Sequence, residues 1–166
     1  DKGEYETLAQ QFQPIEDDGV IEDYGFKLAL PEGWEATGDF GHFENKKKNQ
    51  VVELTVVKYT YDDYYKLNKD FHDQFKSKAP DLKISWEENV ELGKDFKGVC
   101  RFTMTVEETT SVLYFFENSG NTYKLLFNAQ GSTTAIADSE AFCKAMTFKP
   151  YTYYPDVTSA TTEAKK

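Results

Sequence analysis

Apolar and polar residues alternate with a period of two along several short stretches of the chain. In the stretch Tyr24–Trp34, Phe26, Leu28 and Leu30 share one side of an extended backbone, with Lys27 and Ala29 on the other. A proline at position 31 has no amide hydrogen for a sheet ladder, so the strand must end there. The pattern predicts a strand with one face on a core, followed by a turn.

The same alternation recurs along the rest of the chain, with turn residues between the segments. We expect strands at Val20–Ile21, Phe26–Leu30, His42–Glu44, Gln50–Tyr59, Lys83–Leu92, Phe96–Val106, Ser111–Glu117 and Thr122–Ala129. The last four are joined by connections too short for a parallel crossover, which permits only antiparallel neighbours. Gln50–Tyr59 is apolar on both faces and is therefore expected to be covered on both sides.

Two segments change to a helical period. The first begins at Thr60–Asp63, which has the spacing of a capping box, and ends before Pro80. Its expected core stripe consists of Tyr64, Leu67, Phe71 and Phe75. The second helix follows Gly131–Thr134, with a stripe of Ala135, Ile136, Ser139, Phe142, Cys143 and Met146.

This order of elements predicts an α+β fold, with a single antiparallel sheet of about six or more strands packed by two main helices. The 166 residues suffice for one core. We expect a polar lead-in or tether at 1–19, a single domain at 20–150 and a C-terminal tail at 151–166.

Charge and hydropathy narrow the classes of partner. The chain has 19 Lys and Arg against 29 Asp and Glu, a formal net charge of -10. Such a chain repels phosphate, so nucleic-acid binding is not expected despite 11 Tyr and 13 Phe. The longest apolar run, Val112–Phe116, is far shorter than the roughly 20 residues of a transmembrane helix. We expect no transmembrane segment and a monomer.

The polar, acidic opening Asp1–Asp18 is typical of a tether left after an export signal or a lipid-anchor segment is removed. An arbitrary boundary would leave the same sequence. The expected location is extracytoplasmic, with a lipid anchor upstream.

Two cysteines, Cys100 and Cys143, have neither the spacing of a metal site nor that of a redox pair. Two readings stay open, namely two buried thiols or one structural disulfide. Both residues lie on predicted apolar faces, so we expect them in the same core layer, and bonded in an oxidised, exported protein.

Catalytic patterns are missing from the sequence. His72 lies about 140° from the centre of the first helical stripe, which predicts a solvated side chain. His42 stands without a second histidine or a cysteine nearby, whereas a zinc site usually assembles several ligands. There is no Gly-x-Ser-x-Gly elbow and no phosphate-binding glycine loop. We expect no catalytic residue, no cofactor and no metal.

Tyrosines form the one remaining group of candidate binding residues. Tyr59, Tyr61, Tyr64 and Tyr65 surround the junction between the strand and the first helix, and Tyr151, Tyr153 and Tyr154 follow the second helix. An apolar ring with a polar tip suits a binding surface. The alternative, which is favoured, is that some of these rings pack in the core and the rest seal its edges.

The order of elements resembles the PsbP/Mog-type fold, named for a photosystem II extrinsic subunit and a Ran-binding import factor. The resemblance rests on Tyr24–Trp34 at the front and Phe142–Phe148 at the back. Bacterial exported lipoproteins of unassigned role, including DcrB-like proteins, are similar. The family has no common catalytic motif, so the resemblance implies a fold and assigns no site residue.

These expectations favour a non-catalytic, extracytoplasmic binding or accessory module, the soluble domain of a tethered lipoprotein with a protein or small-molecule partner. One alternative is a hydrolytic or metal-dependent enzyme with a site converging around His42. Another is a cytosolic adaptor.

Overall fold

The computed structural model describes residues 20–23, 26–37 and 41–148. Its elements are β1 (Val20–Asp23), β2 (Phe26–Ala29), β3 (Glu35–Ala36), β4 (His42–Asn45), β5 (Gln50–Val57), α2 (Tyr61–Lys78), β6 (Lys83–Glu88), β7 (Lys97–Val106), β8 (Thr109–Asn118), β9 (Asn121–Gln130), α3 (Ala135–Lys144) and β10 (Met146–Phe148). The predicted α+β fold is confirmed.

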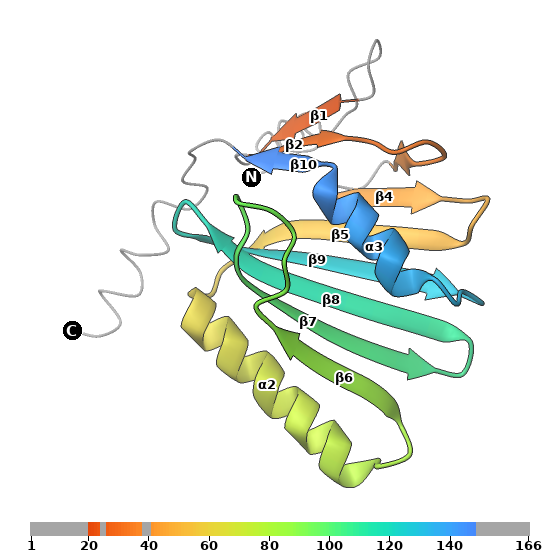
Figure 1. Ribbon diagram of the computed structural model, residues 1–166, viewed down its shortest axis with the longest axis vertical. Coiled ribbons are helices and arrows are strands. Elements are labelled where there is room, and N and C mark those ends of the chain that lie inside the picture. Colours follow the sequence, from red (N-terminus) through yellow and green to blue (C-terminus); the bar gives the residue numbers. More distant parts are fainter. Residues whose placement is uncertain (1–19, 24–25, 38–40, 149–166) are drawn as a thin grey trace, which may run out of the picture.

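A large antiparallel sheet forms the centre of the molecule, with strand order β3-β4-β5-β9-β8-β7-β6 (Figure 1). Its longest hairpin, β8–β9, turns through Ser119 and Gly120, whose φ angles of 52° and 78° suit the tight two-residue turns of twisted hairpins. The strands β5 and β7 both belong to this sheet, as the sequence predicts.

The two helices cover opposite faces of the sheet. Neighbouring residues on a strand point to opposite faces, and in β8 the hydroxyl of Tyr114 is 2.7 Å from Ser139 Oγ of α3. The next residue, Phe115, instead meets the ring of Tyr64 of α2, with ring centroids 5.3 Å apart. We call these two sides the α3 face and the α2 face.

A second, three-stranded sheet with the order β1-β2-β10 closes the α3 face (Figure 1). The predicted strand at Phe26–Leu30 lies here rather than in the large sheet, with Phe26 and Leu28 buried. Beyond it the Trp34 amide donates to the Pro31 carbonyl at 3.1 Å, which closes the predicted turn. Trp34 then packs edge-on against Phe142 of α3, with ring centroids 4.8 Å apart.

Nearly all of the buried apolar residues belong to a cluster on the α3 face, whereas the α2 face has a small cluster of Tyr64, Cys100 and Phe115. The predicted cover on both sides of β5 is found only at its end, where the half-buried Val57 packs against the small cluster. Val52, Leu54 and Val56 are buried, while Val51 on the opposite side is 41% exposed.

Several expectations lie outside the described residues. They concern Tyr24 and Gly25 of the opening stretch, the lead-in 1–19, and the tail with Tyr151, Tyr153 and Tyr154. Within the described part of the chain, no helix combines the length and apolar character needed to cross a membrane.

Candidate binding surface on helix α2

The tyrosines at the start of α2 mainly attach this helix to the sheet. Tyr64 is buried against Phe115. The Tyr61 hydroxyl donates to the Gly98 carbonyl and lies 3.4 Å from Cys100 Sγ. The Tyr65 hydroxyl donates to Glu88 Oε2 at 2.6 Å, and this hydrogen bond to a carboxylate raises the pKa of Tyr65 to about 12. These three rings seal the edge of the core.

Tyr59 is the exception among the four predicted surface tyrosines, because it is 49% exposed. The helix begins immediately after it, where Thr60 Oγ1 accepts a hydrogen bond from the Asp63 amide at 3.2 Å. The predicted N-cap is confirmed, and it fixes the direction in which α2 leaves β5.

His72 contradicts the prediction of a solvated side chain. It is only 5% exposed, and its ring packs 5.6 Å from Trp86 and 5.4 Å from Phe102, measured between centroids. Its Nδ1 lies 2.9 Å from Asp73 Oδ1, a contact that lowers the pKa of Asp73. An imidazole can occupy an aromatic site when its polar nitrogen reaches a carboxylate, and hydropathy alone does not reveal this.

The predicted core stripe of α2 is also displaced from its expected position. Leu67 and Phe71 are 52% and 51% exposed, and the Phe71 ring packs on its own helix, 4.6 Å from Phe75. The face that meets the sheet contains Tyr64 and His72 instead. Thus α2 presents an apolar flank to solvent, which we define as Leu67, Phe71 and the half-buried Phe75.

This flank borders a part of the α2 face of the sheet. Tyr65 and Lys69, on the other side of the helix, lie over Glu88 and Trp86 of β6. The flank therefore faces away from β6, toward the half of the sheet formed by β8, β9 and β5. There Leu113 and Leu126 pair across β8 and β9 and are half-buried.

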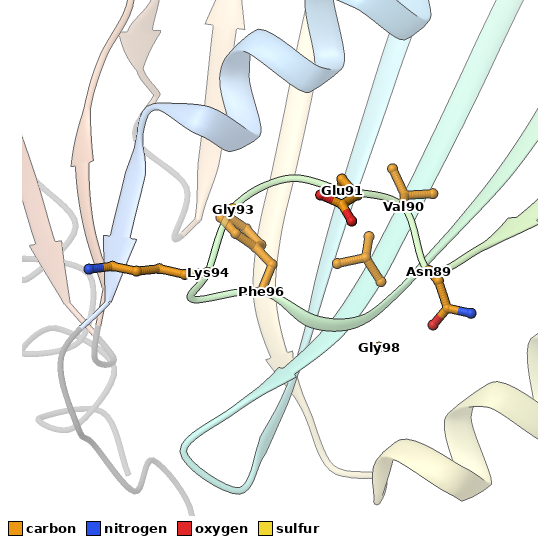
Figure 2. A pocket seen from close by; sticks show the side chains of 8 residues that line it. Asn89, Val90, Glu91, Gly93, Lys94, Phe96 and Gly98 are labelled. Atoms are coloured by element: carbon orange, nitrogen blue, oxygen red, sulfur yellow. The ribbon is translucent and has the colours of Figure 1, made fainter.

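A pocket of about 410 Å³ lies within the loop between β6 and β7 (Figure 2). Its walls include Val90, Phe96 and Val99, and Glu91 and Lys94 are exposed on the same loop. The loop is closed by the Val90 amide, which donates to the Val99 carbonyl at 3.1 Å. The lining combines apolar side chains with polar and charged groups of both signs, a combination that selects no ligand class.

A second pocket of about 310 Å³ lies at the start of α3 and is lined mostly by polar residues. Inside it Gln50 Nε2 donates to Asp138 Oδ2 at 2.8 Å, and the Thr134 hydroxyl donates to the same oxygen at 2.9 Å. The carboxylate of Asp138 is thereby satisfied within the chain.

A buried arginine links the sheet to α3 on the opposite face. Arg101 donates through Nε and Nη2 to the two carboxylate oxygens of Glu87, at 2.7 and 2.8 Å. Its Nη1 donates to Glu140 Oε1 and approaches the Tyr114 hydroxyl at 3.5 Å. The bidentate pairing lowers the pKa of Glu87. Because each of its three nitrogens donates to a partner within the fold, the arrangement has a structural role.

The predicted proximity of the two cysteines is wrong. Cys100 belongs to the cluster beneath α2, whereas Cys143 lies in the core of the α3 face, and both are free thiols. The reason is that α3 packs on the other face of β7, where the neighbouring Arg101 reaches Glu140, while Cys100 shares the α2 face with Phe102. Burial raises the pKa of both thiols.

His42 lies on β4 opposite Glu53 of β5 and lines neither pocket. Within the described ranges, no three His, Cys, Asp or Glu side chains gather as a metal site would require.

Comparison with known proteins supports the fold only. No protein-family model matches the chain, and no curated protein matches it in sequence. Among solved structures, it is similar to cyanobacterial PsbP (CyanoP) from Synechocystis sp. PCC 6803, with 12% identity and a TM-score of 0.52. That match covers 78% of this chain and 91% of the other. A mutant of protein Mog1 matches with 11% identity and a TM-score of 0.38, over 76% and 87%. The match to PsbP supports the PsbP/Mog-like fold, and membership of the DcrB-like lipoproteins is not supported.

Proposed function

We propose that this protein is a non-catalytic accessory module that binds another polypeptide through the apolar flank of α2. The observation that carries the proposal is the exposure of Leu67 and Phe71 beside a half-buried part of the sheet. A single exposed apolar residue is ordinary, but two adjacent ones on a helix that borders apolar sheet residues form a patch. Leucine and phenylalanine on one helix flank suit insertion against a partner's apolar surface.

The fold itself is consistent with this role. The most buried residues on the α3 face maintain the structure, and Arg101 has its donors engaged by Glu87, Glu140 and Tyr114. The polar pocket at the start of α3 has the carboxylate of Asp138 paired within the chain. Among the large apolar side chains exposed on the described residues, Leu67 and Phe71 lie together on α2, whereas Val51, Val106 and Ile136 lie on separate elements.

Site-specific photo-crosslinking tests this function in the cells that produce the protein. A photoreactive residue placed at Gln74, which is exposed on α2, should form adducts with a second polypeptide, and the same residue at the exposed Thr109 should not. The additional substitution Phe71→Ser should abolish the adducts from position 74. The proposal is rejected if adducts do not form, or if they form equally well with Phe71→Ser.

We also propose that the module acts outside the cytoplasm, tethered through the polar segment that precedes β1. The acidic, polar composition of residues 1–19 supports this placement. Determining the coding sequence upstream of Asp1 tests it. A signal peptide with a lipobox cysteine would support the tether, and an upstream sequence without an export signal would favour a cytosolic adaptor.

A further inference from the structure

We infer that the occupant of the α2 flank is the same flank of a second copy of this chain, with the two helices antiparallel. The inference rests on the proposed function, because it names the partner of the same surface. It is carried by three features of α2, namely the spacing of its apolar residues, their exposure and the distribution of charge along the helix.

The apolar flank is symmetric about its middle residue. Leu67 and Phe75 lie four residues before and after Phe71, so they form one row along the helix. A two-fold axis passing beside Phe71 would place Leu67 of each copy against Phe75 of the other. Rows with this spacing pack into the grooves of an identical helix, and a self-complementary patch is what a two-fold dimer requires.

The charges of α2 favour the antiparallel arrangement. The first turn contains Asp62 and Asp63, and the last turn contains Lys76 and Lys78. In an antiparallel pair each acidic end meets a basic end, whereas a parallel pair would bring like charges together. The helix dipoles also attract one another in the antiparallel pair. The charge distribution along α2 therefore favours the antiparallel orientation over the parallel one.

Two of these charges lie close to the apolar row. At 100° per residue, Asp63 is displaced by about 40° from Leu67, and Lys78 by about 20° from Phe71. Both side chains are exposed. Since the two-fold axis relates position 63 to position 79, Asp63 of one copy lies beside Lys78 of the other.

The net charge of -10 on each copy opposes association. This repulsion acts mainly over long distances and is screened beyond about 8 Å at physiological ionic strength. Contacts between the two flanks are short-range and apolar, so they persist. A patch of this size gives a weak, concentration-dependent dimer.

Sedimentation velocity of the full 166-residue chain measures the association. We expect the weight-average mass to rise toward twice that of the monomer between about 5 and about 500 µM, the range in which weak interfaces dissociate. Phe71→Ser should weaken the association at least about tenfold, because it removes a buried phenylalanine from each side. Val106→Ser, which changes a residue that is 50% exposed on β7, should leave it unchanged.

A charge-reversal experiment tests the orientation. Asp63→Lys and Lys78→Glu should each weaken self-association, and an equimolar mixture of the two variants should restore it, because the opposite charges then face each other. In a parallel dimer each single reversal would only replace one like-charge pair by another, so neither variant alone would weaken self-association. Circular dichroism confirms that each variant retains its fold.

The inference is overturned if the chain remains monomeric at about 500 µM or if Phe71→Ser does not weaken the dimer. It is also overturned if mixing Asp63→Lys with Lys78→Glu does not restore self-association. These results are distinct from failure of the proposed function. If the adduct formed from Gln74 has a mass other than that of two copies and depends on Phe71, the accessory function holds and the self-association inference fails.

Discussion

The two faces of the large sheet differ in how they use aromatic residues. On the α3 face, Phe43, Phe127 and Phe142 are almost completely buried. On the α2 face, Phe102 and Phe115 of the sheet are buried, but Phe71 of the helix is half exposed. The same residue type therefore stabilises the fold on one side and remains available for contact on the other. The apolar residues of a helix therefore do not by themselves identify its buried face.

The sharpest test of this comparison exchanges one phenylalanine on each face for alanine. Phe142→Ala removes a ring that packs 4.8 Å from Trp34 and 5.7 Å from Phe43, and should lower the free energy of unfolding by about 3 to 5 kcal/mol. Phe71→Ala should change it by less than about 0.5 kcal/mol, because the site is half exposed and alanine favours the helix. Urea denaturation of both variants measures the difference, and equal losses would refute the contrast between the faces.

Arg101→Met tests the polar link on the α3 face. The variant keeps the length of the side chain but loses its hydrogen bonds to Glu87, Glu140 and Tyr114. We expect a loss of about 2 to 3 kcal/mol, below that of a fully buried ion pair because both carboxylates are partly solvated. Chemical denaturation at neutral pH measures this loss.

The pH dependence of the free energy of unfolding tests the pair of Arg101 and Glu87 separately. Arg101 lowers the pKa of Glu87 below its ordinary value of 4.5, so the folded state binds that proton less readily than the unfolded state. The resulting stabilisation is complete above pH 4.5 and is lost as the pH falls through the lowered pKa. In Arg101→Met, stability should fall less steeply in this acidic range. If the dependence of stability on pH is the same in Arg101→Met as in the original chain, Glu87 is not the source of the acid sensitivity.

The smallest expected effect concerns the contact between α2 and the β-bulge. Gly98 has a φ of +61°, and a Cβ there would lie 3.0 Å from the Tyr61 ring and hydroxyl. Gly120 has a similar φ of +78°, with open space around its Cβ position. We expect Gly120→Ala to cost about 1 kcal/mol from backbone strain and Gly98→Ala about 1 kcal/mol more. Thermal unfolding of both variants tests the tyrosine contact, and equal costs would argue against it.

Much of the fold follows from the sequence, because short connections leave few alternatives. The meander of β6 to β9 is predictable from its alternation and its tight turns. The N-cap at Thr60 is predictable from the spacing between a hydroxyl and the third following amide. The separate sheet of β1, β2 and β10 is not, since β2 and β10 are far apart in sequence and no short turn brings them together.

The candidate surface is less predictable for a physical reason. Periodicity locates the apolar row Leu67, Phe71 and Phe75, but it does not tell whether the sheet offers apolar area on that side. The sheet instead presents Trp86 and Phe102, which accept the ring of His72. Likewise Cys100 and Cys143 both lie on apolar patterns, but periodicity does not tell which face of β7 is covered by α3, and α3 lies on the face opposite to Cys100.

The attachment of α2 by so few buried residues has a consequence for the timing of local opening. Of its eighteen residues, only Tyr64 and His72 are buried, so this helix should separate from the sheet at a lower free energy than that of global unfolding. Cys100 lies directly behind it, whereas Cys143 is enclosed by the opposite core. An alkylating reagent in native buffer should therefore modify Cys100 at the frequency with which α2 opens, and Cys143 only when the whole molecule unfolds.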